Sequence, residues 1–230
     1  MAATIFSGAA VALVLSGLSL CGAARAETLD CADGVFSISA ESGDVAAATC
    51  TAATSALTAL AECGLEPSRR VAISVVDVPM HPQLGACLGF FDTRAECIEA
   101  ADPGHYAALL AEGDARHDLP VDIVLRGVVA HEVTHALAAQ NADVAMIAPA
   151  EHEFVASVFE MNAYGEEARA ALLAADPVRP KGSRGMVNSG IYAMAPRVFA
   201  NNAWQLFQTA EDGCALIRDF LRLDGPPPSE

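Results

Sequence analysis

Apolar residues alternate in one stretch of the chain and recur with helical spacing in several others. Residues 71–78 (Val-Ala-Ile-Ser-Val-Val-Asp-Val) are rich in β-branched side chains and stop at Pro79, which predicts a strand. A looser alternation at residues 35–38 predicts another strand, and the segment between Cys87 and Cys97 predicts a hairpin. Helices are expected near residues 45–62, 103–113, 118–140, 150–161, 165–175, 196–207 and 212–223.

The longest of these helical stretches, residues 118–140, is the most apolar. Asp118 can cap its start, and Pro120 fits the first turn of a helix. Apolar residues occupy every face of this helix, so we expect it to be buried nearly all round.

This helix contains the pentapeptide His131-Glu132-Val133-Thr134-His135. Residues four apart lie on one face of a helix, so His131 and His135 can hold one zinc ion, with Glu132 beside the metal-bound water as general base. Buried polar groups need partners, and a zinc ion would satisfy all three side chains. The alternative is that the histidines are core residues bonded to backbone carbonyls, with Glu132 in a buried ion pair.

A catalytic zinc usually has three protein ligands and one open position. The extended motif with a glycine and a third histidine is absent, because Ala138 and Asn141 stand where those residues would be. The next predicted helix offers Glu153 as our first choice of third ligand. A carboxylate at a helix start can also be a solvated residue that the helix dipole favours. The other candidates, in order of preference, are Glu160, then Glu151 and His152.

The motif and the downstream glutamate resemble the gluzincin type of zincin metallopeptidase. The stretch around His131, the segment Glu-Phe-Val-Ala from Glu153, and Ile191-Tyr192 with the nearby Pro196 and Phe199 are also similar to an uncharacterised bacterial family of exported small zincin-like proteins. This similarity covers roughly residues 118–210. The resemblance implies an α+β, mostly helical, zincin-like fold, with a small sheet packed on a buried active-site helix and stabilised by disulfides.

A zinc-dependent peptidase follows as the first functional hypothesis. His131, His135 and Glu153 would hold Zn²⁺, and Glu132 would transfer the proton during hydrolysis of a peptide or protein substrate. The strand at residues 71–78 would belong to the sheet above the cleft. A donor for the developing oxyanion would also be needed, and the candidates are Tyr192 first, then Tyr164 and His152.

The alternative hypothesis is a non-catalytic or degenerate zincin scaffold that acts as a periplasmic binding or interaction protein. The small size of the chain leaves little room for a large second lobe around a cleft, which favours this hypothesis. The presence of Glu132 opposes it, because a scaffold that only binds zinc has no need of that carboxylate.

The N-terminal segment has the pattern of an export signal. Residues 5–20 are almost unbroken apolar or small, and Ala24-Arg25-Ala26 is an A-x-A cleavage pattern, although no basic residue precedes the apolar run. We expect residues 1–26 to be a signal peptide, residues 27–230 to be one domain, and the protein to be periplasmic or secreted. A lipoprotein modified at Cys21 and a membrane anchor are the alternatives. No later segment is expected to span a membrane.

Cysteine content and charge agree with export. The six cysteines after Cys21 favour three disulfides, and Cys87 with Cys97 is the best single pair; the absence of any C-x-x-C argues against a cysteine metal site. The formal net charge of −16 disfavours nucleic acid or anionic lipid as a partner. We expect a monomer.

Overall fold

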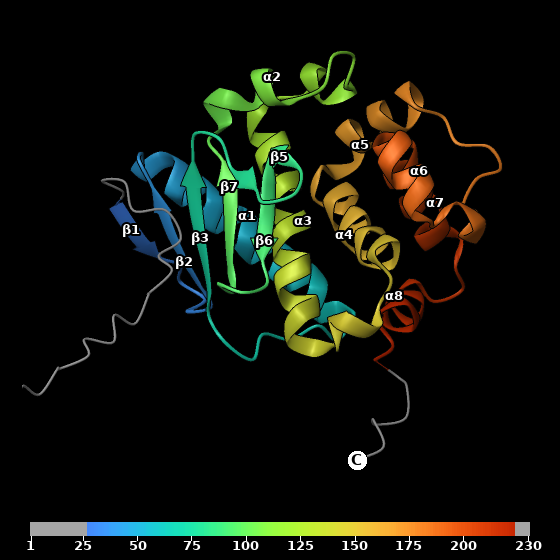
Figure 1. Ribbon diagram of the computed structural model, residues 1–230, viewed down its shortest axis with the longest axis horizontal. Helices are drawn as coiled ribbons and strands as arrows, with labels where there is room; N and C mark the ends of the chain where they lie inside the picture. The colour runs from blue at the N-terminus through green and yellow to red at the C-terminus, as the bar shows by residue number, and fades with distance from the viewer. Residues whose placement is uncertain (1–26, 224–230) are drawn as a thin grey trace, which may run out of the picture.

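The β-branched run predicted as a strand forms β3 (Val71–Val76), the centre of a five-stranded sheet with the order β1-β2-β3-β7-β6. The computed structural model describes residues 27–223 (Figure 1). β2 and β7 run parallel to β3 on either side, whereas the edge strands β1 and β6 are antiparallel to their neighbours. The other strands are β1 (Glu27–Asp30), β2 (Phe36–Ala40), β6 (Gly89–Asp92) and β7 (Cys97–Ala101).

The predicted hairpin between Cys87 and Cys97 is present as β6 and β7, with Phe91 opposite Ile98. Before it, β4 (Met80–His81) and β5 (Gly85–Ala86) form a small separate hairpin.

The parallel pair β2 and β3 is joined by α1 (Gly43–Glu62), which packs against β2 and α3. Its N-cap is Ser42. By length and composition alone, α1 is apolar enough to cross a membrane, although no segment after residue 26 was expected to span one. Its buried side chains are those of a helix packed in the core.

Two long helices, α3 (Val121–Asn141) and α4 (Pro149–Ala163), form the layer beside the sheet, with α3 between the sheet and α4 (Figure 1). α3 is buried through its middle, as its apolar pattern predicts. Its first turn is not, because Val121 is 51% exposed. The cap also differs from the prediction: Asp118 ends the preceding short helix, and Pro120 is the N-cap of α3.

The remaining short helices surround α3 and α4. Among them, α7 packs against α4, and α8 packs against both α4 and α7. Their bounds are η1 (Pro103–His105), α2 (Tyr106–Leu109), η2 (Ala115–Asp118), η3 (Val144–Met146), α5 (Gly165–Ala175), η4 (Arg184–Met186), α6 (Ser189–Met194), α7 (Pro196–Thr209) and α8 (Gly213–Leu221).

Two disulfides join described residues, Cys31–Cys50 and Cys63–Cys214. The predicted Cys87–Cys97 pair is wrong, because Cys97 is disulfide-bonded while Cys87 keeps a free thiol. The strand register explains the error: Asp92 pairs with Cys97, so Cys87 lies well beyond the reach of a disulfide along the hairpin.

The fold is thus α+β and mostly helical, with a small sheet and two disulfides among residues 27–223, as predicted at that level. Disulfides are typical of extracellular and periplasmic proteins, which agrees with the expected location. The predicted signal peptide lies outside the described residues.

Candidate metal centre

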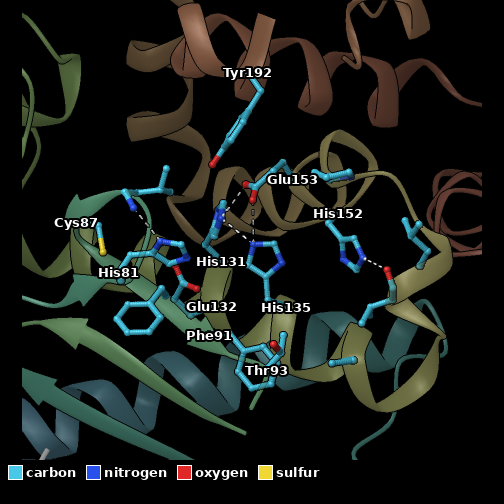
Figure 2. A pocket seen from close by; sticks show the side chains of 17 residues that line it. His81, Cys87, Phe91, Thr93, His131, Glu132, His135, His152, Glu153 and Tyr192 are labelled. Atoms are coloured by element: carbon cyan, nitrogen blue, oxygen red, sulfur yellow. Dashed lines mark hydrogen bonds and ion pairs between the residues drawn. The ribbon is translucent and has the colours of Figure 1, made fainter. Parts of the chain in front are cut away.

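Helices α3 and α4 bring His131, His135 and Glu153 together at the centre of the molecule. The Nε2 atoms of His131 and His135 are 3.2 Å apart. The Glu153 oxygens lie 3.4 Å from Nε2 of His131 and 3.6 Å from Nε2 of His135. Figure 2 shows the carboxylate of Glu153 above both imidazoles, and one ligand atom from each of the three residues lies within 4.8 Å of the other two.

The spacing of these side chains fits a tetrahedral zinc ion. Zinc bonds of about 2.0–2.1 Å at tetrahedral angles place neighbouring ligand atoms about 3.3 Å apart. The two histidine nitrogens are 3.2 Å apart, and each lies near a different oxygen of Glu153, His131 at 3.4 Å from Oε2 and His135 at 3.6 Å from Oε1. In addition, Oε2 of Glu153 is buried and, within the described residues, has no hydrogen bond of ordinary geometry, a cost that a bound cation would remove. The chemistry and the geometry of these three side chains, called the donor set below, therefore both fit zinc.

Glu160, the second choice as third ligand, lies on the far side of His131. Its Oε2 is 3.2 Å from Nδ1 of His131. Because a carboxylate can only accept, Nδ1 carries the proton and donates to it. In the neutral imidazole the lone pair of His131 is therefore on Nε2, which faces His135 and Glu153. Glu160 orients a donor residue and lies outside the donor set.

Glu160 is itself held by buried polar side chains. The Tyr164 hydroxyl donates to Oε1 over 2.6 Å, and Arg197 donates from Nη1 to Oε1 over 2.9 Å and from Nη2 to Oε2 over 3.3 Å. Nη1 of Arg116 lies 3.6 Å from Oε1. Burial alone would raise the pKa of Glu160, but Arg197, His131 and Arg116 outweigh burial and hold this pKa well below its usual value. Glu160 therefore remains a carboxylate.

The two arginines were missed from the sequence. They come from η2 and α7, far from the motif, and nothing in their local sequence marks them. The one available signal was that Glu160 and Tyr164 are four residues apart, so that both face the same side of α4.

The three donor residues differ in their affinity for protons. Burial opposes a charge on His131, but hydrogen bonds with Glu153 and Glu160 outweigh burial and raise the pKa of His131 well above its usual value. Burial lowers the pKa of His135 to about 4. Burial would raise the pKa of Glu153, yet the charges of His135 and His131 lower this pKa to about 2. A neutral His135 and an ionised Glu153 are the forms that bind metal ions, and zinc would compete only with the proton on His131.

Glu132 points from α3 toward β6 and is buried. A Cβ atom built on Gly89 would lie 3.0 Å from Cγ of Glu132, so any larger residue at position 89 would crowd this side chain. Burial raises the pKa of Glu132 to about 7, with His131 acting in the opposite direction. The backbone N–H of Phe91 donates to the carboxylate. Glu132 is thus close to half-protonated at neutral pH.

The donor set and Glu132 line one cleft of about 390 Å³. Tyr192 points from α6 into this cleft toward Glu153 (Figure 2). Burial and the charge of Glu153 raise the pKa of Tyr192, so the phenol stays protonated. His152 also lines the cleft, and its Nε2 lies 3.3 Å from the carbonyl oxygen of Val144.

The other sequence candidates lie outside the donor set. Oε2 of Glu151 accepts from the backbone N–H of Ala148 and from Arg222. Tyr164 is buried and donates to Glu160.

No curated protein and no solved structure is significantly similar to the chain. A family model matches residues 36–224, a range that includes the donor set, Glu132, Glu160 and Tyr192. Because the match covers most of the sequence, the chain belongs to the family of unknown function DUF6639.

Proposed function

We propose that this protein is an exported zinc-dependent peptidase of the zincin type. In this proposal His131, His135 and Glu153 hold the ion and Glu132 is the general base. The observation that carries it is the close approach of the two histidine nitrogens and the Glu153 carboxylate, at separations of 3.2 to 3.6 Å, in a cleft that they share with the buried carboxylate of Glu132. Bound zinc would supply a Lewis acid and a water molecule of lowered pKa.

Glu132 has the properties of a general base. A catalytic base works best when its pKa is near the working pH, because it must accept a proton and then return it to the leaving amine. Burial brings the pKa of Glu132 to about 7, and Gly89 leaves space for the carboxylate at the edge of the sheet. This combination supports a proton-transfer role over a buried ion pair, since no basic partner of Glu132 other than His131 lowers its pKa.

Tyr192 is the donor that we assign to the developing negative oxygen. Its hydroxyl is protonated, faces the cleft and comes from α6, opposite the helix that carries Glu132. A preoriented O–H group in a partly buried site stabilises a transition-state charge more than it stabilises the neutral carbonyl. His152 also lines the cleft, but its Nε2 is engaged with the carbonyl oxygen of Val144 at 3.3 Å.

In this proposal, the substrate backbone lies along the outer edge of β6, which has no partner strand among the described residues. β6 is the last strand of the sheet, and Gly89, Phe90 and Phe91 line the cleft. β3, the strand expected above the cleft from the sequence, is paired on both sides and has no free edge. An extended peptide can add to an exposed strand edge through main-chain hydrogen bonds, with its side chains in adjacent pockets.

Metal analysis and hydrolysis together test this function. Purified protein should carry close to one zinc per chain and should cleave a mixed peptide pool, with the products identified by mass spectrometry. Glu132→Gln should keep the metal and abolish cleavage, whereas Glu153→Ala should lose the metal. A protein without zinc would refute the metal site. A zinc protein that cleaves no peptide would refute the peptidase and favour the alternative, a non-catalytic binding protein of the periplasm.

A further inference from the structure

A second cavity, of about 300 Å³, opens from the same centre. Its lining shares Gly89, His131, Glu132 and Tyr192 with the first cleft, so the two meet at the general base. A molecule held at the donor set can therefore extend into both. The first cleft is lined mainly by apolar and aromatic groups with histidines, whereas the second has a different chemistry.

Two arginines distinguish the second cavity. Arg116 from η2 and Arg197 from α7 both line it, with side chains only 15% and 16% exposed. Arg116 donates to the Asp114 carboxylate from Nε over 3.0 Å and from Nη2 over 2.7 Å. Arg197 donates to Glu160 from Nη1 and Nη2. Each arginine side chain is thus held in place by one carboxylate, Asp114 for Arg116 and Glu160 for Arg197.

Neither guanidinium is satisfied by these bonds. A guanidinium has five N–H groups, and the two carboxylates accept from only two of them on each arginine. Within the described chain, Nε of Arg197 is buried without any hydrogen-bond partner. Nη1 of Arg116 lies 3.6 Å from Oε1 of Glu160, an ion pair longer than a hydrogen bond. Buried donors without acceptors are costly, so the two guanidinium groups that line the cavity keep N–H groups for a further acceptor.

A carboxylate matches this arrangement better than a carbonyl. It offers about four lone-pair positions to donors from two guanidinium groups, and arginine binds it through two parallel hydrogen bonds. Asp114 and Glu160 do not fill this role, since each is already engaged in fixing its arginine. The rest of the lining is about half apolar, with Leu88, Leu109 and Val128 among its residues, and this apolar surface strengthens a charge-assisted bond.

We propose that this second cavity binds a carboxylate of the substrate, held by Arg116 and Arg197 next to the bond that is cleaved. The inference rests on the proposed peptidase function and deepens it by naming a substrate class. The carboxylate has two possible sources, the C-terminus of the peptide or an aspartate or glutamate side chain. The first source would make the protein a carboxypeptidase, and the second would make it an endopeptidase with acidic specificity.

Binding to the Glu132→Gln protein loaded with zinc tests the inference without turnover. Isothermal titration would compare benzoyl-Gly-Phe with its C-terminal amide, and benzoyl-Gly-Glu amide with benzoyl-Gly-Gln amide. In at least one pair the carboxylate should bind about tenfold or more tightly, a difference typical of a charge-assisted bidentate bond. The pair that shows the preference identifies the source of the carboxylate.

Variants of Arg116 assign the preference to this cavity. Arg116→Gln should abolish the preference for the carboxylate, and Arg116→Lys, which keeps the charge and loses the planar fork, should reduce it. Arg126→Gln is the matched control, because Arg126 is exposed on α3, pairs with Asp122 and lies away from this cavity. Each preference is the ratio of two affinities that are measured on one protein sample. Partial unfolding of a variant changes both affinities alike and leaves this ratio unchanged.

The outcomes separate the subsite from the peptidase. Equal affinities within each pair, including no detectable binding of any probe, would overturn the subsite, and so would a preference that survives in both Arg116 variants. If the wild-type protein cleaves peptides without any preference for a carboxylate, only the subsite fails. If the preference is present but the wild-type protein cleaves nothing, the subsite stands and the peptidase fails.

Discussion

His131 is held at both of its ring nitrogens, and each contact has a different consequence. Nε2 faces the other two donors, while Nδ1 donates to Glu160. In the proposed site, the same type of residue, glutamate, is thus a metal ligand at position 153 and orients a ligand histidine from position 160. The distinction depends on which nitrogen each carboxylate meets, and helical spacing alone does not reveal it.

The first prediction concerns Glu160→Gln. An amide oxygen accepts the Nδ1 proton of His131 less strongly than a carboxylate does, so zinc affinity should fall by about 10- to 100-fold, the usual effect of losing such a support. Competition with a chromophoric chelator measures the affinity. Glu166→Gln in the first turn of α5 is the control and should leave affinity unchanged. A loss as complete as that of Glu153→Ala would instead make Glu160 a direct ligand.

At the scale of elements, the site depends on how closely α3 and α4 approach each other. Gly127 lies one turn before His131, and a Cβ atom built there would be 2.3 Å from Cε1 of Tyr164. The ring of Tyr164 therefore packs directly on the backbone of α3, which places its hydroxyl within reach of Glu160. The close contact with Tyr164 therefore explains why a glycine stands at this position of the helix.

The second prediction follows from this contact. Alanine is favoured over glycine within a helix by about 1 kcal/mol, so Gly127→Ala would stabilise an unconstrained helix. Here the added methyl group must displace a buried tyrosine, and overpacking costs about 1–3 kcal/mol or more. We expect the variant to be less stable in urea denaturation and to bind zinc more weakly. Arg126→Ala, at the neighbouring exposed position, should change neither; an unchanged midpoint for Gly127→Ala would mean that Tyr164 yields without cost.

The limits of prediction from sequence also lie at this scale. The central helix, the helix that carries Glu153, and the strand that became β3 all follow from local periodicity, which a single segment contains. The order of the sheet, with β6 at the free edge, depends on pairing between distant segments. For the same reason Arg116 and Arg197 could not be assigned to Glu160, because their positions depend on how η2 and α7 pack.

The cysteine prediction failed for a related reason. A short separation between Cys87 and Cys97 suggested a bridge, but residues near each other in sequence need the right register as well. The bond that was not foreseen, Cys63–Cys214, joins the end of α1 to α8 across a separation of 151 residues. Sequence alone allows many connectivities and does not choose among them.

At the scale of the whole molecule, the two disulfides that join described residues close loops of very different length. Chain-entropy arguments give about 5 kcal/mol for a loop near 150 residues and about 3 kcal/mol for one near 20. The third prediction is therefore that Cys63→Ser with Cys214→Ser destabilises the protein more than Cys31→Ser with Cys50→Ser, whose separation is 19 residues. Denaturant unfolding of the two double variants measures the difference. The reverse order would show that strain or residual structure outweighs loop entropy.

The last prediction concerns coupling between zinc and the fold. The three donors come from α3 and α4 and meet only when these helices pack, so zinc should bind the folded chain and stabilise it. At a free zinc concentration of about 1,000 times Kd the gain is about 4 kcal/mol, which should appear as a higher Tm in calorimetry. Chelation should remove this gain and zinc should restore it.

Glu153→Ala should show little response to zinc, whereas Glu132→Gln should respond like the wild type, because Glu132 lies outside the donor set. Equal responses of the Glu153→Ala protein and the wild type would place zinc elsewhere in the molecule.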